Sequence, residues 1–224
     1  MPDFETLPWH PWPQRSDADR LERAHAFLET MATRRRCRHF SDAPVPRALI
    51  EAAIRTAGTA PSGANHQPWH FAAIASPETK AAIRAAAEHE ERNFYGGRAG
   101  EEWLRALNPL GTGPDKPFLE TAPWLIAVFA QRRGGLDLAQ RAQNYYVTES
   151  VGIACGLLLA SLHQAGIATL IHTPNPMRFL NRLCHRPADE KPLMIVVAGH
   201  PAPGAVIPAH ATRKKSLEQI ASWL

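Results

Sequence analysis

The sequence predicts an α/β or α+β sandwich, in which helices cover a central sheet. Segments with helical periodicity alternate with short apolar runs that are typical of buried strands. The chain has 224 residues, which is enough for one sizeable domain and short for two. Its apolar content of 45% and charged content of 21% are ordinary for a globular protein and unlike those of a disordered chain.

The N-terminal half is expected to contribute three helices and one strand. Ser16 is a favourable N-cap for the first helix, and Pro46 suits the first turn of the second. Gly58 ends the second helix, and the loop TAPSGANHQP leads into an apolar strand. The expected segments are an extended arm over residues 1–15, helices over 16–33 and 46–58, a strand over 69–74, and a helix from 77 past 91.

The C-terminal half is expected to contribute a long buried helix and three strands. Residues 95–117 contain several Gly and Pro, show little periodicity, and are expected to form a mobile excursion. The longest apolar run, 151–162, is interrupted by Gly152 and Gly156 and is too short to span a bilayer. The expected segments are strands over 124–130, 168–172 and 193–198, helices over 145–165 and after 176, and a basic tail over the last twenty residues.

Several common kinds of site are not supported by the sequence. No GxGxxG follows a strand and no GxxxxGK[ST] is present, and the run Gly111-Thr112-Gly113 is too short for either motif. The three cysteines lack CxxC spacing and the eleven histidines lack HExxH, so we expect neither a disulfide framework nor a metal site. The N-terminus does not have the pattern of a secretory signal, and the simplest expected location is the cytoplasm, without a membrane partner.

Two clusters of cations indicate an anionic ligand. They are Arg34, Arg35, Arg36 and Arg38 in the segment RRRCRHFS, and Arg213, Lys214 and Lys215 near the C-terminus. Several guanidinium groups together can clamp a phosphate through bidentate hydrogen bonds. With a net charge of +4, a nucleic acid or a merely solvated surface would also fit. No recognition helix or aromatic platform accompanies the clusters, so a nucleic-acid partner is not expected.

The segment TAPSGANHQPW, residues 59–69, has the composition of a ligand-binding loop. Gly63 allows backbone N–H groups to approach a ligand, Ser62 supplies a hydroxyl, and Pro61 stiffens the loop. Taken alone, this is also the composition of an ordinary turn. Combined with RRxxRxFS before it, and with YYVTESVGIACGLLLASLHQAGI and PLMIVVAGHP after it, the loop resembles the nitroreductase family, and in particular the iodotyrosine deiodinases. The resemblance extends from about Phe27 to the C-terminus.

The resemblance implies a nitroreductase-like fold of the α+β class, an α/β sandwich whose central, mostly antiparallel sheet is flanked by helices. It implies one FMN-binding domain over residues 16–224, with an active-site lid at about 88–117 and a C-terminal extension at about 203–224. It also implies a domain-swapped homodimer that builds two FMN sites from both chains. The FMN is expected to contact Arg34, Arg35 and Arg38, and Arg36 stands where the family has a serine. Pro61, Ser62 and Gly63 would lie beside the flavin ring, and Thr173 would lie at the flavin N5. Lys214 would contact the phosphate, or Arg213 in its place because of an insertion just before Lys214.

The same resemblance implies a substrate. The deiodinase lid carries a glutamate, a tyrosine four residues later and a lysine twenty-one residues after that, and Glu91, Tyr95 and Lys116 match these spacings. A zwitterion needs an acceptor for its ammonium and a cation for its carboxylate, and exclusion of water strengthens both ion pairs. The backbone N–H of Ala64 would hold the phenolate. The alternative is an ordinary surface pair on a helix, with a solvated lysine.

The implied activity is that of an FMN-dependent oxidoreductase that dehalogenates halogenated L-tyrosines, with Thr173 as the catalytic residue. The flavin performs the redox chemistry, and the protein tunes it. NAD(P)H or a reductase is the expected donor of electrons to the flavin. One alternative is a broad-specificity FMN nitroreductase or quinone reductase. A more distant alternative is a non-catalytic protein that binds nucleic acids or other anions.

Overall fold

The computed structural model describes residues 4–9 and 13–224, which form two compact units. The first unit ends at Thr33 and contains α1 (Asp17–Thr33), and the second is Arg34–Leu224. Residues 4–9 and 13–15 of the expected arm contain no helix or strand, and residues 1–3 and 10–12 lie outside the described part of the chain. The division between the units therefore falls at the end of α1 rather than after residue 15.

Helix α1 begins where its capping residue predicts. The backbone N–H of Asp19 donates to the Ser16 hydroxyl at 3.2 Å, as an N-cap requires. None of the helix's side chains is buried, and apolar residues such as Phe27 and Leu28 are more than half exposed. The apolar residues of α1 therefore do not form part of a core among the described residues.

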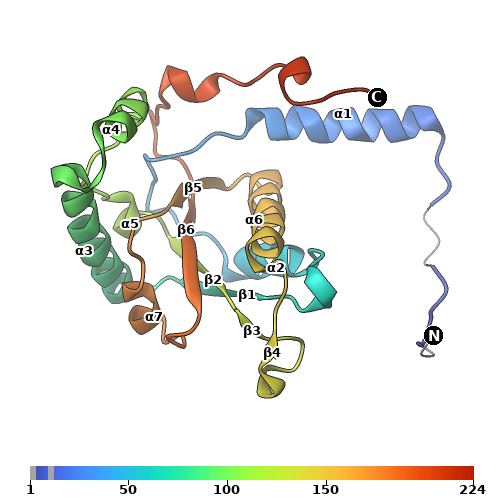
Figure 1. Cartoon of the computed structure of the whole chain (residues 1–224). Coiled ribbons are helices and arrows are strands. Elements are labelled where there is room, and N and C mark those ends of the chain that lie inside the picture. The colour runs from blue at the N-terminus through green and yellow to red at the C-terminus, as the bar shows by residue number, and fades with distance from the viewer. Residues whose placement is uncertain (1–3, 10–12) are drawn as a thin grey trace. The chain divides into compact units, whose positions relative to one another are not determined.

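A four-stranded antiparallel sheet forms the centre of the second unit (Figure 1). Its strands are β1 (Trp69–Ile74), β2 (Trp124–Ala130), β6 (Lys191–Gly199) and β5 (Ala168–His172), in that spatial order. Every neighbouring pair is antiparallel. The structure thus confirms the expected antiparallel sheet and places all four expected strands within it.

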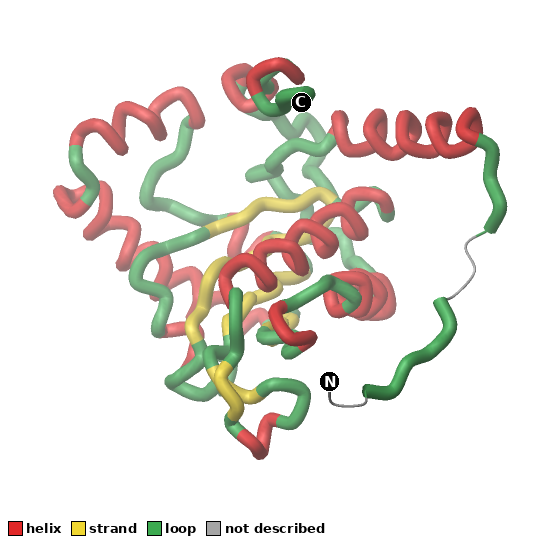
Figure 2. Tube along the Cα trace, turned by 45° about the vertical axis from the view of Figure 1, so that its right-hand side comes forward, coloured by secondary structure: helices red, strands yellow, loops and turns green. Residues whose placement is uncertain are grey.

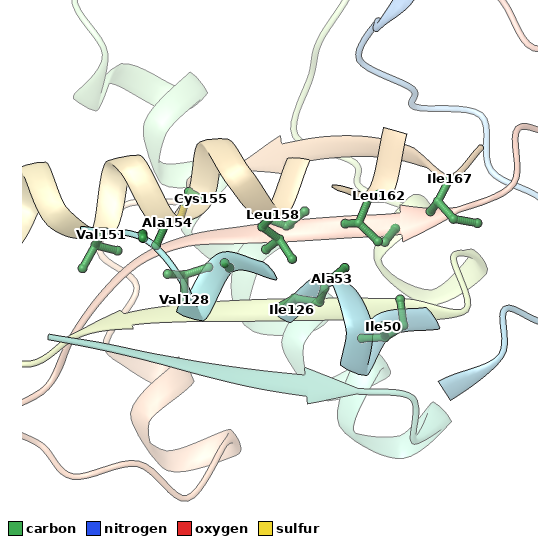
Figure 3. Packing of buried hydrophobic residues seen from close by; sticks show 14 of the residues in the cluster. Ile50, Ala53, Ile126, Val128, Val151, Ala154, Cys155, Leu158, Leu162 and Ile167 are labelled. Carbon is green, nitrogen blue, oxygen red and sulfur yellow. The ribbon is translucent and has the colours of Figure 1, made fainter. Parts of the chain in front are cut away.

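Helices cover both faces of the sheet, as the views in Figures 1 and 2 show. Side chains alternate along β2, so Ile126 and Val128 join one core cluster while Leu125 and Phe129 join another. The first cluster lies under α2 (Arg47–Gly58) and α6 (Val147–Gln164), and Figure 3 shows its packing. The second lies under α3 (Pro77–Asn93), α5 (Phe118–Thr121) and α7 (Phe179–Leu183). Burial on both faces explains why β2 is a continuous apolar run.

The segment between α3 and α5, expected to be a mobile excursion, contains short helical elements that the sequence did not predict. It contains a π-helical turn, η2 (Phe94–Arg98), the helix α4 (Glu101–Leu107) and a 3-10 turn, η3 (Asn108–Leu110). These pieces are too short to show helical periodicity in sequence, and Gly97 has a positive φ of 139° where the chain turns. We call residues 88–117 the lid.

Small elements that the sequence did not predict complete the unit. A hairpin of β3 (Arg133–Gly134) and β4 (Ala142–Gln143), with η4 (Leu138–Gln140) between its strands, precedes α6. The turn η1 (Gly63–Asn65) precedes β1, and the C-terminal extension contains η5 (Ala209–Thr212) and η6 (Leu217–Gln219). Within the described part of the chain, no helix has both the length and the apolar character that a membrane crossing needs.

Candidate active site

A cavity of about 240 Å³ lies where the end of β5 meets the lid. Its wall includes Thr173, just after β5, and three lid residues, Glu91, Tyr95 and Lys116. The sequence predicted these four residues as site residues, and the structure brings them to one cavity. They come from α3, η2, the loop before α5 and the loop after β5.

A buried ion pair forms one wall of this cavity. The ammonium of Lys116 lies 3.1 Å from a carboxylate oxygen of Glu91, and the two side chains are only 4% and 12% exposed. The same ammonium lies 5.7 Å from the centre of the Tyr95 ring, within reach of a cation–π attraction. The cavity thus holds the Glu91 carboxylate, which can accept from a cation, beside the Lys116 ammonium, which can donate to an anion. In the structure these two groups pair with each other.

A short glycine-flanked loop fixes the position of Lys116. Its ammonium donates to the Thr112 hydroxyl at 3.3 Å and to the Gly113 carbonyl, and its backbone N–H donates to a Glu88 carboxylate oxygen at 2.8 Å. The run Gly111-Thr112-Gly113 is too short for a phosphate-binding motif, and its contact with Lys116 was not predicted from the sequence. The available signal was a hydroxyl residue four positions before Lys116, next to glycines that leave carbonyls accessible.

Aromatic side chains of the lid line the cavity. The Phe94 ring packs edge-on against Tyr95, with centroids 5.3 Å apart, and against Trp103, with centroids 4.9 Å apart. Both arrangements are the favourable T-shaped geometry. The Arg98 guanidinium donates to Glu90 at 2.9 Å and also to the carbonyl of Asn175, so it connects the lid to the loop that carries Thr173.

Residues 36–38 of the arginine cluster form an extended segment beside β5. Arg36 bridges Thr169 of β5, and the Cys37 N–H donates to the Thr169 carbonyl at 3.1 Å. Side chains alternate along this extended segment, so Cys37 is buried while Arg36 and Arg38 line the cavity. Partial burial, and then the nearby Arg36, lower the pKa of Arg38. The Arg36 position, which departs from the family pattern, is thus beside the cavity.

Arg34 and Arg35 occupy a different position from Arg36 and Arg38. Both are partly buried, and the Arg35 guanidinium donates to the Arg34 carbonyl at 2.8 Å. Neither lines the cavity described above. Their predicted contact with a phosphate stays a prediction.

His172, the last residue of β5, was not predicted as a site residue. It lines the cavity, is 7% exposed, and packs edge-on against Phe118 at 5.7 Å between ring centroids. Burial, and then the charges of Lys116 and Arg38, lower its pKa to about 3. The imidazole is therefore neutral at physiological pH.

We expect His172 to make the protein sensitive to mild acid. Between roughly pH 6.5 and pH 4, the unfolding free energy should fall about 1.4 kcal/mol per pH unit more steeply than in His172→Leu. The unfolded ring takes up a proton near its ordinary pKa, whereas the folded ring stays neutral, so acid favours the unfolded chain. Urea unfolding of both proteins across this range measures the two slopes, and equal slopes would show that the ring is not held neutral.

The predicted cofactor loop, residues 61–64, does not line the cavity of Glu91 and Lys116. It packs against the start of α6. The Gly63 N–H donates to the Ser150 hydroxyl at 3.3 Å, and the Ser62 hydroxyl accepts from the Gln67 N–H at 2.9 Å. Ala64 has a positive φ of 51°. Within the described residues of one chain, neither Pro61 nor these residues line the cavity of Glu91 and Lys116.

Gly63 is required where this loop meets the residue before α6. A Cβ at this position would lie 2.6 Å from the carbonyl oxygen of Tyr145, which is closer than real contacts allow. We therefore expect Gly63→Ala to displace the loop and lower the unfolding free energy by about 1–3 kcal/mol. Gly58→Ala is the matched control, because a Cβ there has no neighbour within 4 Å. Urea unfolding compares them, and equal effects of the two substitutions would contradict the close approach.

The C-terminal extension runs past the arginine segment. The Ala202 N–H donates to the His39 carbonyl at 2.8 Å, and the Val206 N–H lies 3.3 Å from His39 Nδ1. A second cavity, between this extension and the lid tip, is also lined by Arg36 and Arg38. The predicted phosphate contacts Arg213 and Lys214 lie further along, after η5, and are exposed.

The residues around the cavity fit the expected flavin cofactor in type. Arg36 and Arg38 offer guanidinium donors, and Thr173 offers a hydroxyl. On the same cavity, Nε2 of His172 is a buried polar atom without a partner among the described residues, a feature separate from the flavin contacts. Unpartnered polar atoms of this kind are rare in folded proteins and suggest that a ligand supplies the missing contact. Among the residues that the structure describes, no group of three or more His, Cys, Asp or Glu is placed to hold a metal ion.

Comparisons with known proteins show the family to which the chain belongs. Residues 31–200 match the model of the nitroreductase family. The chain is 49% identical over 188 residues to an iodotyrosine deiodinase from Haliscomenobacter hydrossis, which covers 84% of this chain and 85% of the relative. It is 40% identical over 205 residues to human iodotyrosine deiodinase 1, which covers 91% of this chain and 70% of the relative.

Solved structures show the same fold. A crystal structure of oxidized iodotyrosine deiodinase bound to FMN and 3-iodo-L-tyrosine superposes with a TM-score of 0.68 and 29% identity, covering 79% of this chain and 90% of the other. A nitroreductase from Desulfitobacterium hafniense with bound FMN has a TM-score of 0.64 at 18% identity, covering 88% and 97%. The second likeness supports the fold alone.

Proposed function

Because the chain belongs to the nitroreductase family, we propose that it is an FMN-dependent reductive dehalogenase of halogenated L-tyrosines, of the iodotyrosine deiodinase type. The observation that carries this proposal is the buried pair of Glu91 and Lys116, which lies with Tyr95 and Thr173 on one cavity. In the proposed reaction, two electrons and one proton replace the carbon–halogen bond with a carbon–hydrogen bond, and halide leaves.

The pair of Glu91 and Lys116 is complementary to an amino-acid zwitterion. Its carboxylate can accept from a substrate ammonium, and its ammonium can donate to a substrate carboxylate. Both side chains are already desolvated, so the protein meets part of the cost of burying charge before the substrate arrives. Tyr95 and Phe94 exclude water above them, which strengthens the new ion pairs.

Cofactor contacts come from the positions that the family pattern predicts. Arg34, Arg35, Arg36 and Arg38, with Arg213 or Lys214, would hold the phosphate, because guanidinium groups form bidentate hydrogen bonds with phosphate oxygens. Pro61, Ser62 and Gly63 would lie beside the ring, and the Thr173 hydroxyl would donate to N5. Bound FMN would supply the reducing electrons, which it would receive from NAD(P)H or from a reductase.

A homodimer would bring the two parts of the site together. The loop of residues 61–64 and the cavity of Lys116 are separate within one chain, and a loop from a second subunit can complete the cavity. The backbone N–H of Ala64 would then reach the substrate phenolate. Helix α6 supports this arrangement, because Gly152, Ile153 and Gly156 leave an exposed strip along an otherwise buried helix. Small residues of this kind allow a close approach between helices.

An anaerobic titration tests the proposed function. The purified protein should be yellow, and after reduction it should be reoxidised by 3-iodo-L-tyrosine with release of one iodide per flavin. A nitroarene titrated in parallel distinguishes the main alternative. Reoxidation by the nitroarene alone would reject the dehalogenase in favour of a broad-specificity nitroreductase or quinone reductase.

A further inference from the structure

His172 contains a buried polar atom that the folded chain does not satisfy. Its Nε2 has no hydrogen-bond partner among the described residues, although the side chain is 7% exposed. Leaving a buried donor or acceptor unpaired lowers stability, and an apolar side chain of similar size would avoid that cost. A histidine at this position therefore suits a state of the protein in which something else pairs with the ring.

The place of His172 in the fold limits what that partner can be. It is the last residue of β5, it precedes Thr173, and it lines the same cavity as Lys116 and Arg38. The Phe118 ring covers one side of the imidazole. Because His172 lines this cavity, a ligand bound there is the candidate partner.

The charges around the ring indicate the chemistry of the partner. Lys116 and Arg38 are the two charged groups that act on His172, and both are cations. Burial, with smaller contributions from these two cations, keeps the ring neutral, so that it carries a single N–H. The positive potential of the two cations attracts an anionic group and repels an ammonium. An oxygen anion next to Lys116 meets both conditions.

We propose that His172 is a substrate-contacting residue whose Nε2–H donates to the carboxylate that Lys116 holds. The inference rests on the proposed function, because the amino-acid substrate supplies that carboxylate. In the ligand-free chain, the Lys116 ammonium is engaged by Glu91. Binding of a zwitterion separates this pair and places the substrate carboxylate between Lys116 and His172.

Binding to the oxidised, FMN-loaded protein tests this role without turnover. Quenching of flavin fluorescence would give the Kd of two ligands, 3-iodo-L-tyrosine and 3-iodotyramine, which lacks the carboxylate. We expect His172→Leu to weaken iodotyrosine about ten- to a hundredfold, as for loss of a hydrogen bond to a charged group. The Kd of iodotyramine should change by less than about twofold, because the interaction is then absent from both proteins.

Two further measurements separate this role from a structural one. His172→Gln keeps an N–H at similar reach and should retain most of the iodotyrosine affinity. His172→Leu should melt no lower than the unmodified protein at neutral pH, because it removes an unpaired polar atom. Unchanged iodotyrosine binding in His172→Leu, or equal weakening of both ligands, would overturn the inference. If the unmodified protein does not bind iodotyrosine, the proposed function itself fails.

Discussion

Glu91→Gln is expected to weaken binding of 3-iodo-L-tyrosine about a hundredfold while leaving the reduction of a nitroarene nearly unchanged. The substitution removes the charge that accepts the substrate ammonium and keeps the size of the side chain. Truncating one partner of a buried charge pair at a binding contact generally costs about 2–5 kcal/mol, and a hundredfold loss corresponds to about 2.7 kcal/mol. A nitroarene has no ammonium and does not use this contact.

Glu101→Gln provides the matched control for Glu91→Gln. Glu101, like Glu91, is a lid glutamate paired with a cation. Its side chain is 93% exposed and lies 3.8 Å from the guanidinium of Arg105. An exposed pair of this kind contributes little, so both activities should stay near those of the unmodified protein. Steady-state kinetics with both substrates measures the effects. Equal losses for iodotyrosine and nitroarene in Glu91→Gln would reject the zwitterion clamp.

Arg38→Met is expected to weaken FMN binding about a hundredfold, as for loss of a bidentate hydrogen bond to phosphate or to the flavin edge. Arg38 is partly buried, lines the cavity, and has no acidic partner among the residues that the structure describes. Partial burial, and then the nearby Arg36, lower the pKa of Arg38, as is typical of a guanidinium that has lost hydration. An anionic ligand would compensate for this loss, whereas methionine keeps the length of the side chain without the charge.

Fluorescence titration of the flavin-free protein with FMN measures the Arg38 effect. Arg105→Met is the matched control, because Arg105 lies in the lid, is 78% exposed and pairs only with Glu101 among the described residues. We expect its FMN affinity to be unchanged. Full retention of FMN by Arg38→Met would place the phosphate anchor elsewhere, with Arg34, Arg35 and Arg36 the remaining members of the cluster.

The parts of the fold that sequence predicted well are those whose pattern reflects burial. The apolar runs of β1, β2 and β5 coincide with the observed strands because both faces of the sheet are covered. Helix α2 begins after Pro46 and ends at Gly58, where local backbone preferences are strong. The resemblance to the deiodinases implied that Glu91 and Lys116 belong to one site; both line one cavity in the structure, and their role in binding stays a prediction.

The parts that sequence could not predict depend on contacts between distant residues. Helix α4 is seven residues long and is held by packing such as that of Phe94 on Trp103, so periodicity could not reveal it. The burial of His172 and its missing partner arise from the meeting of β5 with the lid, which no local pattern encodes. The loop of residues 61–64 and the cavity of Lys116 remain apart within one chain, and their union stays a prediction about a dimer.

A crystal structure of the FMN-loaded protein with 3-iodo-L-tyrosine would test the central claim most directly. We expect the contact between the Lys116 ammonium and the Glu91 carboxylate, now 3.1 Å, to be replaced. The substrate carboxylate should then lie within hydrogen-bond distance of Lys116, and its ammonium within hydrogen-bond distance of Glu91. An intact pair, with the ligand bound elsewhere or with its amino-acid end in solvent, would contradict the account.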